Sequence, residues 1–304
     1  MDDLVVEVLG ELVPRPVRRG ELRRDGRALR WVETGAGSPA VVLDAALAEP
    51  GSLAWAGVMP LITPRVRVMA YDRAGIGASD PVSPLTLAAQ LDDLTALARE
   101  AGGRCVLVGH SWGGMLAQLV ALRHPELIAG LVLADPADEN FLAALPAEDH
   151  QEQFALGEMA LAQHASGGLP DIIQDTFGSF ARNLTDDQQL RTRILDAYAS
   201  CYADRSRARM VGDEYRLVLE SLALIRQRRA AGTLPDVPVV IFSATTGRDP
   251  AQRAMWNGFH ADLAASVPRG KHIVLADTDH AMNQTRAPQI AEAINHIIED
   301  NPPR

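Results

Sequence analysis

Apolar positions along this chain follow two alternating patterns, short continuous runs and longer stretches with helical spacing. The continuous runs, rich in β-branched residues, predict buried strands at 40–43, 66–71, 105–109, 128–133, 238–243 and 272–276. The helical spacing predicts helices at 53–62, 86–101, 112–123, 251–266 and 288–300. Because strands alternate with helices, we expect the α/β class, with a doubly wound, mostly parallel sheet.

The first part of the chain departs from this alternation. A leader that ends at Pro16 precedes two segments with strand character, at 17–24 and 28–33. The dipeptide Asp25-Gly26 stands between them and favours a tight two-residue turn. We therefore expect the sheet to begin with an antiparallel hairpin.

The alternation also stops between residues 136 and 235, where the sequence shows only helical patterns. One of them spans 213–229 and gathers Leu217, Leu222 and Ile225 on one helix face. A helical segment of this length between two strands indicates an inserted cap, or lid. We expect a core domain made of residues 1–135 and 236–304, with the cap at 136–235.

One stretch ends a predicted strand, turns sharply and starts a helix: Gly109-His110-Ser111-Trp112-Gly113-Gly114. Side chains two residues before and after Ser111 would collide in such a turn, so glycine is required there for steric reasons. The turn lifts the Ser111 hydroxyl above the edge of the sheet, and the next helix directs its free N–H groups toward that hydroxyl. The pattern Gly-x-Ser-x-Gly is typical of a nucleophile elbow.

Composition and charge narrow the class of protein. Of the 304 residues, 47% are hydrophobic, and 29 basic and 39 acidic residues give a formal net charge of −10. These values indicate a soluble globular protein and argue against nucleic acid or an anionic membrane surface as a partner. The two cysteines, Cys105 and Cys201, are too few for a disulfide framework or a metal cluster, so we expect free thiols.

Targeting and cofactor signals are also missing from the sequence. The N-terminal residues, Met1 to Leu4, lack the basic region and apolar run of a signal peptide, and no window reaches about 18 uninterrupted apolar residues. We therefore expect a cytoplasmic protein that does not enter the membrane. The sequence has no phosphate-binding loop, no dinucleotide fingerprint and no established metal-ligand spacing, so we predict no cofactor and no metal. It gives no sign of the oligomeric state.

Taken together, these motifs make the chain resemble the α/β-hydrolase fold superfamily. The likeness rests on the elbow at 109–114, on the glycine-rich stretch 71–80 (YDRAGIGASD), and on Asp279-His280 between the last predicted strand and helix. It extends from about Val17 to Ile298. The resemblance implies a catalytic serine, an acid and a histidine in that order along the chain.

An activated serine needs a base within hydrogen-bond reach and an acid that orients the base. His280 follows the last predicted strand at the sheet edge where Ser111 also lies, so it is the predicted base. Two acids remain open. Asp135 ends the strand after the elbow helix, whereas Asp249 follows the next strand, which is the commoner position in the superfamily. We favour Asp135, because Asp249 lies further out along its loop.

The resemblance also implies two backbone donors for the negative charge that develops on the carbonyl oxygen of a substrate. One is the N–H of Trp112, and the other is predicted to be the N–H of Leu47, in the loop after strand 40–43. Many members of the superfamily have His-Gly where this chain has Ala45-Ala46. Alanine adopts positive φ less readily than glycine, so the chain departs from the family pattern in this loop.

These residues predict a cofactor-independent serine hydrolase that cleaves an ester, lactone or related carbonyl bond of a small apolar substrate through an acyl-enzyme. Epoxide hydrolases and haloalkane dehalogenases of this fold need a carboxylate where Ser111 stands, so acyl transfer to water is the simpler chemistry. Two alternatives remain, a C–C bond hydrolase or lyase with the same triad, and a noncatalytic small-molecule receptor on the same fold. The presence of both Ser111 and His280 argues against the receptor.

Overall fold

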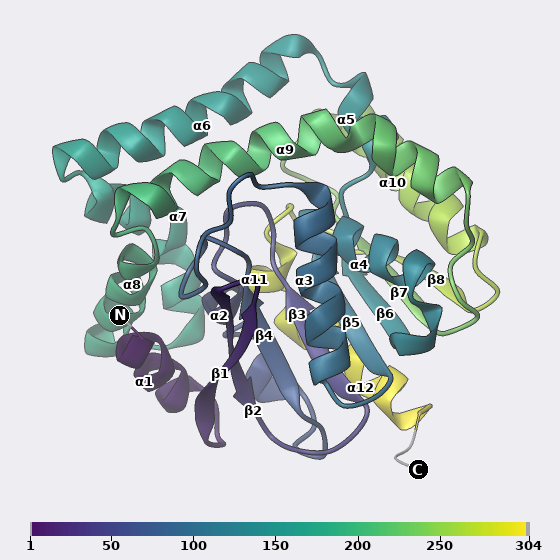
Figure 1. Ribbon diagram of the computed structural model, residues 1–304, viewed down its shortest axis with the longest axis horizontal. Coiled ribbons are helices and arrows are strands. Elements are labelled where there is room, and N and C mark those ends of the chain that lie inside the picture. The colour runs from purple at the N-terminus through teal and green to yellow at the C-terminus, as the bar shows by residue number, and fades with distance from the viewer. Residues whose placement is uncertain (1, 302–304) are drawn as a thin grey trace.

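The computed structural model describes residues 2–301, and at its centre lies a sheet of eight strands (Figure 1). Their order across the sheet is β1-β2-β4-β3-β5-β6-β7-β8. Their bounds are Val17–Arg24 (β1), Arg27–Thr34 (β2), Ala40–Asp44 (β3), Val68–Asp72 (β4), Cys105–His110 (β5), Ile128–Ala134 (β6), Val239–Ser243 (β7) and Gly270–Val274 (β8). β2 runs antiparallel to β1 and β4, and the strands from β4 to β8 run parallel to one another. The predicted α/β class and mostly parallel sheet are confirmed.

Helices cover both faces of this sheet. Those outside the segment between β6 and β7 are Asp2–Leu12 (α1), Gly51–Ala54 (α2), Met59–Leu61 (η1), Leu87–Glu100 (α3), Trp112–Arg123 (α4), Pro125–Leu127 (η2), Pro250–Ala265 (α10), Met282–Thr285 (α11) and Ala287–Glu299 (α12). In β5, Val106 and Val108 pack into a core that includes α12, whereas Cys105 and Leu107 pack into one that includes α3 and α4. Burial on both faces explains the continuous apolar runs of the central strands.

The predicted N-terminal hairpin is also confirmed. β1 and β2 pair in antiparallel register, with Arg24 opposite Arg27. Asp25 and Gly26 have positive φ angles of 49° and 79°. Positive φ at both central residues is the conformation of a type I′ turn, which matches the twist of the flanking strands.

Between β6 and β7 the chain forms a run of helices. Their bounds are Glu139–Ala144 (α5), Ala147–Ser166 (α6), Leu169–Leu184 (α7), Gln188–Cys201 (α8) and Arg205–Ala230 (α9). α6 and α9 pack side by side and cross above the sheet in the view of Figure 1. The expected helical insert is therefore present, and its role as a separate cap domain at 136–235 stays a prediction.

Four features of the structure differ from what the sequence pattern indicates. The helix expected at 53–62 is wrong, because this segment forms only α2, a turn and η1. Pro60 lies inside it, and proline has no N–H for a helical hydrogen bond. The leader contains a helix, α1, that was not expected. β8 begins at Gly270 rather than at His272, and the short α11 precedes α12.

The structure also tests the expectations about membrane-spanning helices and about the two cysteine thiols. No helix within residues 2–301 is both long enough and apolar enough to cross a membrane. Cys105 and Cys201 are buried free thiols, as expected. Burial raises the pKa of the Cys105 thiol to about 12, so it stays protonated at neutral pH.

Candidate active site

Ser111 lies in the tight turn between β5 and α4. Its φ of 52° and ψ of −115° belong to a conformation that residues other than glycine rarely adopt. A Cβ added at Gly109 would come within 2.4 Å of the Gly113 backbone, and one at Gly113 within 2.6 Å of the Asp44 carbonyl oxygen. The two glycines therefore let the chain turn here and let α4 approach the end of β3.

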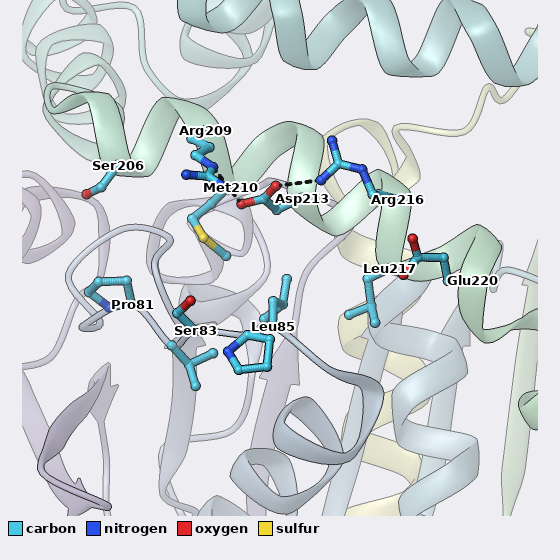
Figure 2. Close-up of a pocket in the computed structure, with 12 residues that line it drawn as sticks. Pro81, Ser83, Leu85, Ser206, Arg209, Met210, Asp213, Arg216, Leu217 and Glu220 are labelled. Carbon is cyan, nitrogen blue, oxygen red and sulfur yellow. Dashed lines mark hydrogen bonds and ion pairs between the residues drawn. The ribbon is translucent and has the colours of Figure 1, made fainter.

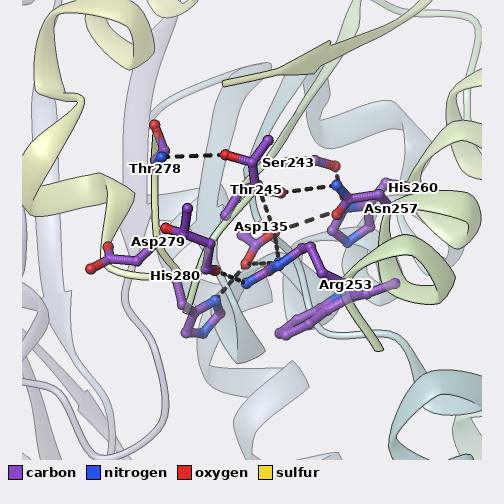
Figure 3. A network of polar contacts seen from close by, with 12 residues as sticks. Asp135, Ser243, Thr245, Arg253, Asn257, His260, Thr278, Asp279 and His280 are labelled. Atoms are coloured by element: carbon purple, nitrogen blue, oxygen red, sulfur yellow. Dashed lines mark hydrogen bonds and ion pairs between the residues drawn. The ribbon is translucent and has the colours of Figure 1, made fainter. Parts of the chain in front are cut away.

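Two more of the predicted site residues meet at the same sheet edge (Figure 3). Asp135 directly follows β6, and its side chain is fully buried. Its Oδ2 accepts a 2.7 Å hydrogen bond from His280 Nδ1. Arg253 Nη1 lies 3.0 and 2.9 Å from the two carboxylate oxygens, and the Ala244 N–H donates to Oδ1 at 3.2 Å. The carboxylate is therefore fixed from three sides.

The surroundings favour an ionised Asp135 and a neutral His280. Burial alone raises the pKa of Asp135, but the hydrogen bond from His280 and the positive charge of Arg253 outweigh burial and hold this pKa well below its usual range. Burial lowers the pKa of His280, and the Asp135 carboxylate only partly opposes that shift. Since Nδ1–H donates to Asp135, the other ring nitrogen, Nε2, keeps its lone pair. A general base needs this protonation state.

The alternative acid, Asp249, lies at the N-terminus of α10. Its Oδ1 accepts hydrogen bonds from the backbone N–H groups of Ala251 and Gln252, at 2.9 and 3.3 Å. These contacts are typical of a helix N-cap, and the side chain is exposed. The structure thus brings Asp135 to His280 and leaves Asp249 as a cap, while the catalytic role of either acid stays a prediction.

Backbone contacts fix Ser111 against the end of β6. The Ser111 N–H donates to the Ala134 carbonyl at 3.1 Å, and the Ala137 N–H donates to the Ser111 carbonyl at 2.9 Å. The centroids of the His110 and His280 rings lie 4.7 Å apart, and His110 Nε2–H donates to the His280 carbonyl at 2.7 Å. Within residues 2–301 the Ser111 hydroxyl makes no hydrogen bond. In unliganded enzymes the bond from nucleophile to base is often long.

Leu47 lies in the loop after β3, beside the elbow, because the Gly113 N–H donates to the Ala45 carbonyl at 3.1 Å. Positive φ in this loop falls on Ala48, at 58°, and on neither Ala45 nor Ala46 among the residues described. The departure from the family pattern at 45–46 therefore creates no left-handed alanine at those two positions. In the described part of the chain the Leu47 N–H has no hydrogen-bond partner, so it is a candidate donor for an oxyanion.

Leu47 lines a cavity of about 310 Å³. Its lining comes from the loop after β3, from the helices between β6 and β7 and from α11, and its apolar side chains include Leu47, Met159, Ile172, Ile173, Phe177 and Val211. Glu49, Gln163 and Gln284 add polar groups. The volume falls at the small end of the range for ligand pockets, about 300–1,000 Å³.

Other candidate sites are less suitable. A pocket of about 380 Å³ lies between the loop at 81–85 and α9 (Figure 2). Asp213 there pairs with Arg209 at 3.3 Å and with Arg216 at 2.9 Å. Glu220 also lines the pocket, so two acidic side chains balance the two arginines. None of the predicted site residues is among the described residues that line it. Across residues 2–301, no three His, Cys, Asp or Glu side chains gather as a metal site.

Arg253 is a site residue that the sequence reading missed. It belongs to a buried stripe on α10 with Trp256, His260 and Ala264. An arginine in an otherwise uncharged buried stripe indicates a buried carboxylate partner, because an unpaired charge there is costly. That spacing was a signal for Arg253, although it does not say which carboxylate is the partner.

Residues 21–293, which include Ser111, Asp135 and His280, match the alpha/beta hydrolase family. The chain belongs to this family. Membership agrees with the eight-stranded sheet and with the sharp turn at Ser111.

Relatives of this alpha/beta hydrolase differ in chemistry. A haloalkane dehalogenase from Sphingobium indicum is 34% identical over 292 residues, covering 90% of this chain and 92% of that protein. Lipase LipV from Mycobacterium tuberculosis is 41% identical over 75 residues, covering 24% of this chain and 29% of the lipase. The chain spans 19% to 29% of the length of the first three curated relatives that it matches. The crystal structure of Cfl2 from Burkholderia cenocepacia, at 24% identity, has a TM-score of 0.71 and covers 92% of this chain and 95% of that one, which supports the fold.

Proposed function

We propose that this alpha/beta hydrolase is a cofactor-independent serine hydrolase that cleaves an ester, lactone or related carbonyl bond of a small apolar substrate. The observation that carries the proposal is the strained elbow at Ser111 beside the hydrogen-bonded pair of the buried Asp135 and the half-buried His280. A hydroxyl at the elbow, rather than a carboxylate, favours acyl transfer over the carbon–halogen and epoxide chemistry of the same fold.

In the proposed reaction, His280 Nε2 takes the proton of the Ser111 hydroxyl as the serine oxygen attacks the substrate carbonyl. Asp135 holds the imidazole through Nδ1 and stabilises the imidazolium that forms. The N–H groups of Leu47 and Trp112 donate to the developing oxyanion. The C–O bond to the leaving group then breaks, and the alcohol receives the proton from His280. Water attacks the acyl-enzyme by the same route and releases the acid.

The cavity at Leu47 supports a small apolar group on the substrate. Its lining is largely apolar, and its volume of about 310 Å³ suits a short acyl or alcohol part. Most of the apolar lining comes from α6, α7 and α9, which supports a role of the segment 136–235 as a cap over the substrate.

The test of this function is the hydrolysis of a chromogenic short-chain ester by Ser111→Ala. We expect kcat to fall about 10⁴-fold or more, the scale found when a triad member is removed. The thermal unfolding midpoint should stay within a few degrees of the wild type, because the change removes one hydroxyl and opens no cavity. Ser266→Ala, at an exposed position, serves as the control and should keep full activity. Full activity in Ser111→Ala would contradict the proposal.

A further inference from the structure

Arg73 directly follows β4, is buried, and uses all five of its N–H donors. Nε and Nη2 donate to the two oxygens of Glu214, at 2.7 and 3.0 Å. Nη1 donates to Asp44 Oδ1 and to the Ala45 carbonyl, both at 2.7 Å, and Nη2 also donates to the Ala46 carbonyl. One guanidinium thus ties a carboxylate to the loop after β3.

Glu214 lies on α9, in the run of helices between β6 and β7, and its side chain is fully buried. Besides Arg73, its Oε2 accepts from the Ala48 N–H at 2.7 Å, and its Oε1 accepts from Gln90 Nε2 at 2.6 Å. Gln90 Oε1 in turn accepts from the indole N–H of Trp112 at 2.9 Å. A single carboxylate therefore connects α9 both to the loop after β3 and to the first residue of α4.

These contacts lie on both sides of the Leu47 N–H along the chain. Arg73 holds the two carbonyls before it, and Glu214 holds the N–H of Ala48 after it. Ala48 has a φ of 58°, a left-handed conformation that alanine keeps only when its neighbours hold it there. The Glu214 carboxylate supplies that hold.

The face of α9 that carries Glu214 is mostly apolar and also carries the buried Ser221. Met210, Leu217 and Val218 are buried on it, and Figure 2 shows Met210 and Leu217 pointing from α9 into the pocket between this helix and the loop at 81–85. A carboxylate among apolar residues is costly unless it is paired and hydrogen-bonded. Its place on this face is therefore explained by its bonds to Arg73 and Ala48 rather than by packing.

We propose that Glu214 and Arg73 are positioning residues for the oxyanion hole, and that through Glu214 the helical insert controls the rate of the chemical step. This inference rests on the proposed serine hydrolase function. The hydrogen bond from Leu47 strengthens as negative charge develops on the substrate oxygen. Misplacing this donor therefore raises the energy of the transition state more than that of the bound substrate.

The variant Glu214→Gln tests this role. An amide at this position presents its NH₂ group to Arg73 or to Ala48, so that two donors face each other. We expect kcat on a chromogenic ester to fall about 10- to 100-fold, with KM changed by less than about threefold. A boronic acid that adds to Ser111 forms a tetrahedral anion, and its affinity should fall in step with kcat/KM.

The matched control is Glu139→Gln. Glu139 is also buried and also pairs with an arginine of α9, since its Oε2 lies 2.7 Å from Arg229 Nη1. Its side chain does not contact the loop after β3 in the described part of the chain. This variant should lower the thermal unfolding midpoint and leave kcat and the boronic acid affinity unchanged.

A rescue experiment separates positioning from general stability. Glycine adopts the backbone conformation of residue 48 without help, so Ala48→Gly in the Glu214→Gln background should recover about threefold or more of the lost kcat. If Glu214→Gln does not fold, Gln90→Met takes its place. That change cuts the link from Glu214 to the Trp112 indole without removing a charge, and it should lower kcat with little change in KM.

Failure of the inference is distinct from failure of the proposed function. A wild-type protein that neither hydrolyses esters nor binds the boronic acid overturns the proposed function. An active wild type in which Glu214→Gln and Glu139→Gln have the same kcat overturns the positioning role alone. A loss of kcat confined to Glu214→Gln, matched by weaker boronic acid binding and recovered by Ala48→Gly, supports it.

Discussion

At the scale of single residues, the hydrogen-bond partners of Asp135 are incompatible with an amide side chain at this position. Its two oxygens face the donors of His280, Arg253 and Ala244, so one NH₂ in place of an oxygen sets donor against donor. Asp135→Asn should lower kcat/KM about 10⁴-fold, the scale of this change in a Ser-His-Asp triad. Asp249→Asn should cost about tenfold or less, because asparagine also caps helices. Measuring kcat/KM of both variants at neutral pH decides which of the two carboxylates is the catalytic acid. A larger loss in Asp249→Asn than in Asp135→Asn would assign that role to Asp249.

Residue positions defined by local pattern could be predicted from the sequence, and those defined by distant contacts could not. Ser111 stands out through its flanking glycines. The choice between the two acids depends on the register of the sheet. β6 ends level with β5, because Ala134 pairs with His110. Asp135, the next residue, therefore lies next to the elbow. Glu214 and Ala48 are 166 residues apart, and no local spacing connects them.

At the scale of elements, α10 carries a buried histidine whose two ring nitrogens are both paired. His260 Nε2 lies 2.8 Å from the Pro136 carbonyl oxygen, and Nδ1 lies 2.7 Å from Ser243 Oγ. Because a carbonyl only accepts, Nε2 carries the proton and Nδ1 accepts from the Ser243 hydroxyl. Burial lowers the pKa of His260 from 6.5 to about 4, although the Asp135 carboxylate opposes the shift.

This histidine makes stability depend on pH. Between pH 6.5 and 4 the unfolded chain binds a proton at His260 more readily than the folded chain. The stabilisation is therefore present above pH 6.5 and is lost as pH falls toward 4. Through this group the free energy of unfolding should fall by about 2 kcal/mol from about pH 7 to pH 5. In urea unfolding, His260→Asn should remove this pH-dependent loss of the free energy of unfolding. The control His296→Asn, at an exposed position, should keep the loss. An unchanged pH dependence in His260→Asn would count against the assignment.

The helices between β6 and β7 are expected to set substrate size. Val211 lies on α9, is half-buried and lines the cavity at Leu47. Val211→Phe should reduce kcat/KM for an octanoate ester relative to an acetate ester by about tenfold or more, since pocket contacts discriminate on this scale. Leu224→Phe changes a 40% exposed residue of the same helix and should leave the ratio unaltered. Equal ratios in both variants would argue against a cap over the substrate.

Elements with strong periodicity could be predicted, and elements broken by proline or attached by long-range packing could not. The apolar strand runs follow from burial on both faces of the sheet, and the apolar helix at 112–123 is itself buried over residues 112–121. The segment 53–62 has helical spacing, but Pro60 interrupts it. In α1, Val5, Val8 and Leu9 have helical spacing and are buried, so the sequence of the short leader does contain a helix signal.

At the scale of the whole molecule, the helical insert and the loops at one edge of the sheet both contribute residues to the candidate site. The insert supplies most of the apolar cavity lining and the buried Glu214, whereas the loops after β3, β5 and β6 supply Leu47, Ser111 and Asp135. Binding and chemistry are thus expected to depend on the same contact between the two parts of the chain. The central claim of this account is that Ser111 is the nucleophile in the folded protein.

Covalent labelling with a fluorophosphonate tests that claim most directly. Trypsin cleaves after Arg104 and Arg123, and in the peptide 105–123 Ser111 is the only residue with a hydroxyl group. Cys105 in the same peptide is buried, and its raised pKa of about 12 keeps it protonated. We predict that the native protein gains one phosphonyl group, with loss of fluoride, on Ser111 of this peptide, and that Ser111→Ala and the unfolded chain gain none. An unlabelled peptide 105–123, or a label on any other peptide, would contradict the account.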